Sequence, residues 1–437
     1  MLIRRYLLAA AGQLLQAFLA LATLAGLAHL LTASDFGTVV LLNSALAILT
    51  IALTAGLQGA AVVHSAATSH ERGEVHGLSL LVAGLISVLS VIVVVTWSTP
   101  LARTLRPGLG PVVVVLAGLQ LGPIVYGDLV LTALSGAGAI RAMVTVGVAA
   151  ATTGLLAPVG AMLFGDHLLG AMAGALSGAA IWAIVVAVVG RRTLGLAPPS
   201  RRMVRRLALR LALPLHIGSV AYWLMLRSDL FVVNAMIGGP VVGVYGLSSA
   251  LSDKVTILTS PAYSAAASRI AGSDEAESMN AMLAIARLEI LIGVVLCAAA
   301  VVFGAPVIQM LGGPDYQGAY VPLAIMVLGS ALLPVWASVG LFLVAHADGA
   351  WTTMWLQIGM AAAAFCGYLL VVPLAGIRGA AAVSTVAYAL LTGTGIALAA
   401  RRRPFPLRAL MPGQEDVWAL VRGARQFLRR APISPES

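Results

Sequence analysis

The sequence predicts an all-α polytopic membrane protein, with twelve transmembrane helices in two pseudo-symmetric six-helix bundles around a central cavity. Two observations predict the class. Of the 437 residues, 60% are hydrophobic and only 10% are charged, whereas soluble domains are usually about 25% charged and about 45–50% apolar. The mean hydropathy of +1.00 points the same way. The spacing of the apolar runs then predicts the helices one by one.

A helix needs about 20 apolar residues to cross the hydrocarbon core of a bilayer. Twelve runs meet this requirement, and the connections between them are short. The first run follows the basic segment MLIRRY and continues far beyond the length of a cleavable signal sequence. The predicted spans are residues 6–31, 39–63, 77–97, 111–134, 141–164, 168–190, 213–237, 241–268, 282–303, 320–345, 351–373 and 379–400.

The arginines predict the orientation of these spans. Of the 26 basic residues, 21 fall on the side of the two chain ends and three, Arg103, Arg106 and Arg378, on the opposite side. Cytoplasmic loops carry the excess of Lys and Arg, so we expect both termini in the cytoplasm. The net charge of +10 is thereby explained by topology, and no nucleic-acid partner is needed.

A basic connection divides the spans into two sets of six. We therefore expect an N-terminal bundle at 1–190, a cytoplasmic linker at 191–212, a C-terminal bundle at 213–400 and a cytoplasmic tail at 401–437. PPSRRMVRRLALRLALP in the linker region and QEDVWALVRGARQFLRR in the tail have the pattern of amphipathic helices on an anionic membrane surface. They could be topology anchors or regulatory elements.

The two halves share a short pattern. The segment DFGTVVLLNSAL, residues 35–46, corresponds to VVGVYGLSSAL, residues 241–251, and Gly37 corresponds to Gly243. A repeat of six spans gives both copies the same topology. This predicts a pseudo-two-fold axis along the membrane normal, with substrate between the bundles.

Three segments carry a family resemblance. LTASDFGTVVLLNSALAI with AGLQGA at 55–60, DLFVVNAMIGGPVVGVYGLSSAL at 229–251 and QMLGGPDYQGAYVPLAIMVLG at 309–329 are similar to the corresponding parts of bacterial polysaccharide flippases. The chain resembles the O-antigen and exopolysaccharide branch of the multidrug/oligosaccharidyl-lipid/polysaccharide exporter superfamily. Members have 12 or 14 spans, and the peptidoglycan-precursor branch usually has 14, so twelve spans favour the former branch.

The resemblance implies a function. Members of this branch move undecaprenyl-pyrophosphate-linked oligosaccharides from the cytoplasmic to the periplasmic leaflet of the bacterial inner membrane. We therefore expect lipid-linked oligosaccharide as the cargo, in lipopolysaccharide or exopolysaccharide synthesis. A polysaccharide polymerase and glycosyltransferases are the expected protein partners.

Charged residues inside the seventh and eighth spans are the candidate site. A charge at the centre of a membrane helix costs at least about 2.5–3.5 kcal/mol, so such residues usually pair or face a water-filled cavity. Arg227 and Asp253 differ in predicted depth by only about 3 Å. This predicts a cross-helix pair of Arg227 with Asp253, and a second of Asp229 with Lys254.

Two roles are open for these charges. Arg227 and Lys254 could bind the pyrophosphate of the cargo, since Arg makes bidentate phosphate contacts and Lys is a point charge. Arg141, at the inner end of the fifth span, could receive the headgroup. Alternatively, the charges only neutralise one another and join two helices.

The buried acids are candidates for ion coupling. A carboxylate that changes protonation or binds a cation would suit coupling to a proton or sodium gradient. The candidates are Asp128, Asp229 and Asp253, although Asp128 could equally be a protonated acid bonded to the helix backbone. Glu289 is expected at the membrane interface.

The sequence offers little for an enzyme. No GxxxxGK[ST], HExxH or CxxC motif is present, so we predict no catalytic activity, no cofactor and no metal site. His64, His70 and His76 are expected in a solvated loop. Two alternatives to the flippase remain: a cation-coupled multidrug antiporter of the same superfamily and a non-transporting scaffold of a polysaccharide-assembly complex.

Overall fold

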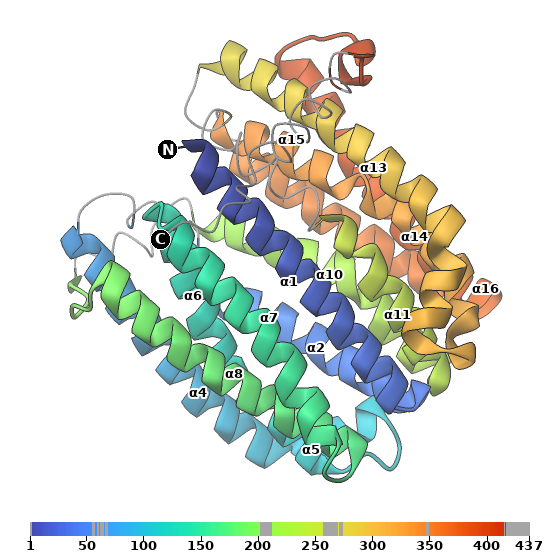
Figure 1. The fold of residues 1–437 in the computed structure, drawn as a ribbon. Coiled ribbons are helices and arrows are strands. Elements are labelled where there is room, and N and C mark those ends of the chain that lie inside the picture. Colours follow the sequence, from blue (N-terminus) through green and yellow to red (C-terminus); the bar gives the residue numbers. More distant parts are fainter. Residues whose placement is uncertain are drawn as a thin grey trace, which may run out of the picture.

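The computed structural model describes residues 2–54, 57–58, 61, 65, 69–201, 212–256, 270, 274–346, 349–414 and 416. These residues form helices and their connections, and no strand occurs among them. The predicted all-α membrane fold is confirmed. Figure 1 shows long helices that run across the molecule roughly side by side, as crossing a bilayer requires.

The first half of the chain supplies seven described helices. Helix α8 (His167–Leu194) shows how the sequence sets the ends of a helix. At its start, the Asp166 carboxylate accepts from the Leu169 N–H at 2.9 Å as an N-cap. At its end, Gly195 follows the last turn with φ 79°. The helices are α1 (Leu2–Leu30), α2 (Ala33–Thr54), α4 (Ser69–Leu105), α5 (Pro111–Leu119), α6 (Leu121–Gly136), α7 (Ile140–Met162) and α8 (His167–Leu194).

The second half contains the longest helix of the described residues, whose course is interrupted once. Gly376 has φ 59° and ψ −144°, a left-handed conformation that glycine adopts without strain, and it separates the two last predicted spans. The elements are α10 (Ala212–Met236), α11 (Pro240–Ser252), α13 (Glu275–Gly312), η1 (Pro314–Ala319), α14 (Tyr320–Ser330), α15 (Leu333–Ala345), α16 (Gly349–Arg402) and η2 (Leu407–Leu410).

Each of the twelve predicted spans overlaps one or more of these helices, so the structure is compatible with twelve crossings. By length and hydropathy, nine helical stretches within the described residues could cross a membrane. The predicted amphipathic segments lie mostly outside the described residues, as 202–211 and 417–437 do.

The outer surface of the bundle is apolar. Leu85 and Val95 on α4 are 64% and 68% exposed, and Val302 on α13 is 64% exposed. A water-soluble protein rarely exposes so continuous an apolar surface, whereas lipid tails accommodate it.

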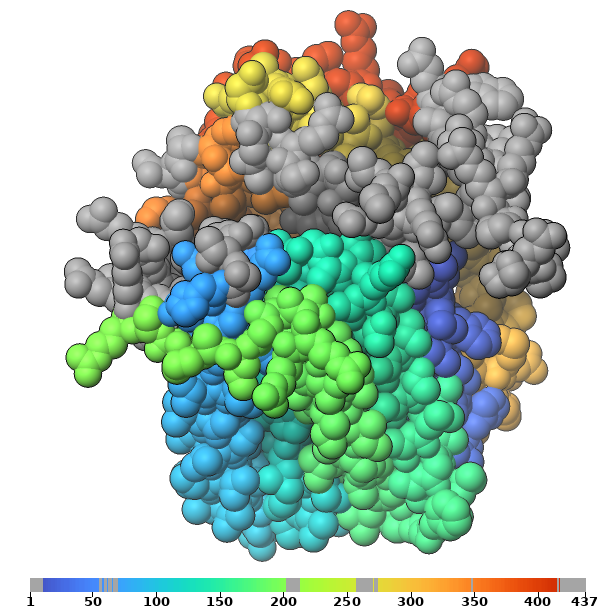
Figure 2. Space-filling view, turned by 60° about the vertical axis from the view of Figure 1, so that its left-hand side comes forward, coloured from blue at the N-terminus to red at the C-terminus, as the bar shows by residue number. Residues whose placement is uncertain are grey.

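Figure 2 brings the N-terminal half of the chain to the lower front of the molecule, with the C-terminal half above and behind it.

The two halves meet at the end of the molecule where α2 and α11 begin. A Cβ atom on Gly37 would lie 2.8 Å from the Gly243 nitrogen, and one on Gly243 would lie 1.9 Å from the Ala33 carbonyl oxygen. The two glycines therefore allow backbone to touch backbone. They are the residues that the repeat pairs, and a two-fold axis between the halves explains why they meet each other.

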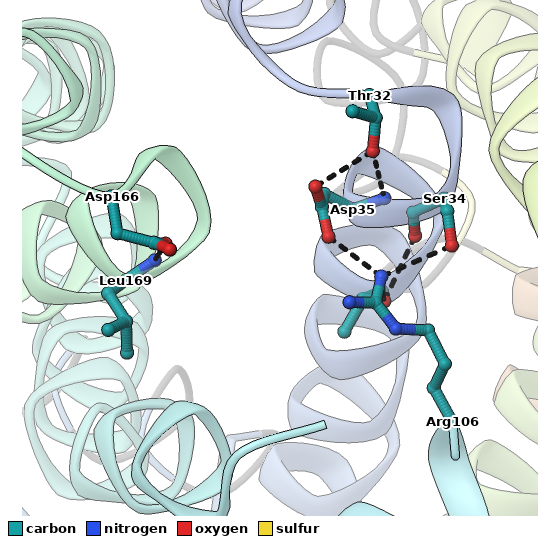
Figure 3. Close-up of polar contacts among 7 residues, drawn as sticks. Thr32, Ser34, Asp35, Arg106, Asp166 and Leu169 are labelled. Atoms are coloured by element: carbon teal, nitrogen blue, oxygen red, sulfur yellow. Dashed lines mark hydrogen bonds and ion pairs between the residues drawn. The ribbon is translucent and has the colours of Figure 1, made fainter. Parts of the chain in front are cut away.

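Polar contacts reinforce this end. Arg106, after α4, reaches Asp35 at 2.7 Å and Ser34 at 3.1 Å at the start of α2 (Figure 3). On the other side of the same view, the Asp166 carboxylate accepts from the Leu169 N–H at the start of α8. Between the halves, the Asn234 side chain of α10 donates to the Leu105 carbonyl at 2.9 Å. We call this the joined end of the molecule.

Candidate functional site

A cavity of about 430 Å³ lies between the two halves. Helices α1, α2 and α7 supply one wall, and α10, α11 and the two residues that follow α11 supply the other. The first wall carries small and apolar side chains with a few neutral polar groups, and the second carries all the charges of the lining. The lining residues on the second wall are Trp223, Arg227, Ser249, Ala250, Asp253 and Lys254.

Arg227 is the best-held charge of this cavity. Its guanidinium makes an ion pair with Asp253 at 2.7 Å, donates to the Ser249 hydroxyl at 3.4 Å and lies 5.8 Å from the centre of the Trp223 ring. The predicted Arg227–Asp253 pair is present in the structure. The guanidinium has five N–H donors, and its Nε has no acceptor in the described part of the chain.

Lys254 lines the same cavity, but its predicted partner does not reach it. Asp229 is fully buried and accepts from the Tyr245 hydroxyl at 2.7 Å, from the Leu230 N–H at 2.8 Å and from the Ser384 hydroxyl at 3.4 Å. The predicted Asp229–Lys254 pair is wrong. No carboxylate of the described residues makes an ion pair with the Lys254 ammonium.

The helix geometry gives the reason. Residues two apart on an α-helix point about 200° away from each other, so Arg227 and Asp229 cannot face the same side of α10. Arg227 faces the cavity, and Asp229 faces the interior of the C-terminal half, where α11 and α16 supply Tyr245 and Ser384. The Ser384 hydroxyl also bonds Tyr368 at 2.9 Å, which extends the buried network.

The other two predicted site residues lie apart from the cavity. Arg141 is exposed at the beginning of α7, ten residues and therefore about 15 Å along the helix from Ala151, which lines the cavity. Asp128 on α6 is half-buried, and no described residue pairs with its carboxylate. The structure thus joins Arg227, Asp253 and Lys254 in one place and leaves Arg141, Asp128 and Asp229 in three others.

Two expectations for polar residues are wrong. Glu289 is fully buried rather than interfacial, and its carboxylate oxygens accept from the Ser338 hydroxyl at 3.0 and 3.1 Å. His76 lies in α4 and not in a loop, because that helix begins at Ser69. It is 2% exposed and contacts the Tyr126 hydroxyl at 2.8 Å. His64 lies outside the described residues.

Sequence reasoning predicted only Arg227, Asp253 and Lys254 of the lining and missed the rest, including Asn43, Trp223 and Ser249. Trp223 precedes Arg227 by one helical turn, and this spacing could have revealed the contact. Asn43 was part of the repeated segment at 35–46 and was not considered as a site residue. Within the described ranges, no group of three His, Cys, Asp or Glu side chains has the arrangement of a metal site.

Comparison with known proteins places the chain in a family. The model of a family described as polysaccharide biosynthesis protein matches residues 2–268, which is more than half of the chain. The chain belongs to the polysaccharide biosynthesis protein family. No curated protein matches it significantly.

Solved structures show the fold of this family member. An inward-facing multidrug resistance MATE family transporter of the MOP superfamily superimposes with a TM-score of 0.68 at 14% identity, over 95% of this chain and 96% of that one. An outward-facing structure gives 0.61 at 15% identity, over 91% and 97%. A Pyrococcus furiosus transporter, described as having a binding pocket of reverse polarity that suggests a different function, gives 0.61 at 15%, over 92% and 94%.

Proposed function

We propose that this protein moves an undecaprenyl-pyrophosphate-linked oligosaccharide from the cytoplasmic to the periplasmic leaflet of the bacterial inner membrane, in lipopolysaccharide or exopolysaccharide synthesis. The observation that carries the proposal is the position of Arg227 and Lys254 on one wall of a cavity between the two halves. A pyrophosphate needs compensating cations to enter the membrane interior. A guanidinium and an ammonium supply them.

The halves would alternate in exposing this cavity to either side. With both termini in the cytoplasm, as the arginines predict, the joined end faces the periplasm and the cargo enters from the cytoplasmic side. The N-terminal bundle, residues 1–190, and the C-terminal bundle, residues 213–400, would be the units that move. Arg141 lies far enough toward the predicted cytoplasmic end to contact the headgroup before it reaches Arg227.

Ion coupling belongs to the same proposal. Of Asp128, Asp229 and Asp253, we favour Asp229 as the coupling residue, because its carboxylate is buried with three neutral donors and contacts no cation of the described residues. Proton or sodium binding there would change the charge of a network that joins α10, α11 and α16. Asp253 is paired with Arg227, so we assign it the role of competing with the cargo for the guanidinium.

The test uses strains that lack the protein and are complemented with variants. Arg227→Ala should abolish surface polysaccharide at normal protein level, since it removes the charge that holds the pyrophosphate, and Arg227→Lys should retain part of it. Arg378→Ala, an exposed arginine outside the cavity, is the matched control. Immunoblots of surface polysaccharide and of the membrane protein supply the readouts.

The alternatives give different outcomes. If Arg227→Ala changes sensitivity to lipophilic cationic drugs and leaves polysaccharide intact, the protein is a multidrug antiporter, as the solved structures of this fold include. If polysaccharide depends on the presence of the protein but not on Arg227 or Lys254, the scaffold function is supported. In that case the polymerase and glycosyltransferases should co-purify with it.

A further inference from the structure

A second cavity, of about 290 Å³, opens beside the first within the N-terminal half. The two share lining residues on α1, α2 and α7, so they adjoin each other, and we call the second cavity the branch. Shared are Thr23, Leu27, Val39, Asn43 and Gly154. Helix α8 and Gln120 close the far wall of the branch.

The chemistry of the branch differs from that of the main cavity. No charged side chain occurs among its lining residues, whereas Asn43, Gln120, Thr23 and Thr153 bring neutral hydrogen-bonding groups to it. Asn43 stands at the junction with the main cavity and is exposed. No hydrogen bond joins its amide to another described residue, so both its N–H donors and its oxygen are available to a ligand.

The walls of the branch are closely packed. On α8, Gly170, Gly174 and Gly178 lie directly on the backbone of α7: a Cβ on Gly174 would lie 2.3 Å from the Ala157 carbonyl oxygen. The Trp182 indole donates to the Val146 carbonyl at 3.1 Å, which fixes its ring in the lining. The small side chains of the lining leave the volume of the branch unfilled, and the close contact of α7 with α8 holds its walls in place.

We propose that this branch is a subsite for an uncharged sugar of the cargo, adjacent to the pyrophosphate held by Arg227 and Lys254. Amide and hydroxyl groups match the hydroxyls of a saccharide, and the Trp182 ring, which lines the branch, supplies an apolar contact for its C–H groups. A polyprenyl chain would leave the Asn43 amide without a partner, and a lipophilic cation would find no carboxylate in the branch. The proposal rests on the proposed function and deepens it.

Two variants change the branch, and one serves as its control. Asn43→Leu keeps the approximate size but removes the hydrogen-bonding groups at the junction. Ala175→Leu fills the branch from α8, where Ala175 lines it. Ala173→Leu places the same side chain on the exposed face of the same helix, so it controls for the effect of a larger residue in α8.

Binding to the purified full-length protein should be measured with three probes. They are undecaprenyl pyrophosphate, the same lipid carrying a trisaccharide, and a phosphate-free glycolipid with that trisaccharide. We expect the trisaccharide to tighten binding of the pyrophosphate lipid. Asn43→Leu should weaken binding of the lipid that carries the trisaccharide about threefold to tenfold, as loss of one or two neutral hydrogen bonds predicts. Ala175→Leu should weaken it at least as much, because its larger side chain occupies the space of the sugar. The affinity of both variants for the lipid without sugar should be unchanged. The Ala173→Leu protein should bind all probes as the unsubstituted protein does.

The outcomes separate the two proposals. If the sugar-free lipid binds through Arg227 but the trisaccharide adds no affinity, or if Asn43→Leu and Ala175→Leu weaken both lipids equally, the sugar subsite is overturned and the flippase function stands. If no pyrophosphate lipid binds but the glycolipid binds in an Asn43-dependent manner, the subsite stands and the pyrophosphate site is wrong. If no probe binds, both are overturned.

Discussion

At the scale of residues, about half a turn of α10 separates two kinds of charge. Arg227 faces the cavity and retains an N–H without an acceptor in the described structure, whereas Asp229 is enclosed by neutral donors in the C-terminal half. A buried charge with hydrogen bonds fixes the rotation of its helix, because any turn about the helix axis would break them. Asp229 therefore helps to aim Arg227 at the cavity.

Tyr245→Phe tests this relation. The substitution removes the hydroxyl that donates to the Asp229 carboxylate at 2.7 Å and leaves a buried acceptor short of one donor. The free energy of unfolding should fall by about 1–3 kcal/mol, measured by unfolding in detergent micelles. The matched control is Tyr320→Phe, whose hydroxyl bonds an exposed backbone carbonyl at 2.9 Å and should change stability much less. Equal losses for both variants would contradict the assigned role.

The residue contacts were only partly predictable from the sequence. Equal depth in the membrane pointed to Arg227 with Asp253, and the structure contains that pair. Depth alone does not tell which side of the helix a residue faces, so the partners of Asp229 were missed. They are the hydroxyls of Tyr245 and of Ser384, the latter 155 residues away in the chain. Glu289 was misplaced for a similar reason, since Ser338 of another helix holds it.

At the scale of elements, the contact between α2 and α11 joins the halves. The repeat in the sequence pairs Gly37 with Gly243, and a two-fold axis brings such equivalent positions together. The ends of the helices were less predictable. Hydropathy places the third span at 77–97, yet α4 extends from Ser69 to Leu105, because helical hydrogen bonds continue beyond the hydrocarbon core.

Gly243→Ala should open the joined end. Its Cβ would lie 1.9 Å from the Ala33 carbonyl oxygen, and overpacking of this kind typically costs about 1–3 kcal/mol. The test uses a protein whose native cysteines are replaced and whose Val40 is changed to Cys as a reporter thiol. When Gly243→Ala is added, a maleimide supplied from the predicted periplasmic side should label this thiol about tenfold faster or more. Gly84→Ala meets no atom within 4 Å and should leave the rate unchanged. An unaltered rate in Gly243→Ala would refute the contact.

At the scale of the whole molecule, the two halves share one apolar core at the joined end. Phe36 of α2 and Tyr316 of η1 pack edge to face, with ring centres 5.7 Å apart, and both belong to a buried cluster that includes residues of α1 and α13. An alternating mechanism has to break these contacts in each cycle. On the proposed function, their strength would set the balance between the two states.

Phe36→Ala should shift that balance. Aromatic pairs contribute about 0.5–1.5 kcal/mol beyond the area they bury, so the state that lacks the contact should gain population by at least about twofold to tenfold. Spin labels at Arg103 and Arg378, exposed positions in the two halves, would report the change as a longer distance in pulsed electron resonance. Phe18→Ala, at a side chain that is 68% exposed, is the control. A distance distribution that matches the unsubstituted protein would count against the proposed movement.

The asymmetric lining of the two cavities has an evolutionary consequence. Arg227 stands on α10 and Lys254 follows α11, whereas most of the neutral polar groups, among them Thr23, Asn43 and Thr153, stand on α1, α2 and α7. On the proposed function, a lineage that adopts a new surface glycan can alter the N-terminal helices while its grip on the carrier lipid stays intact. Diversification among such proteins should accordingly concentrate in the first half of the gene.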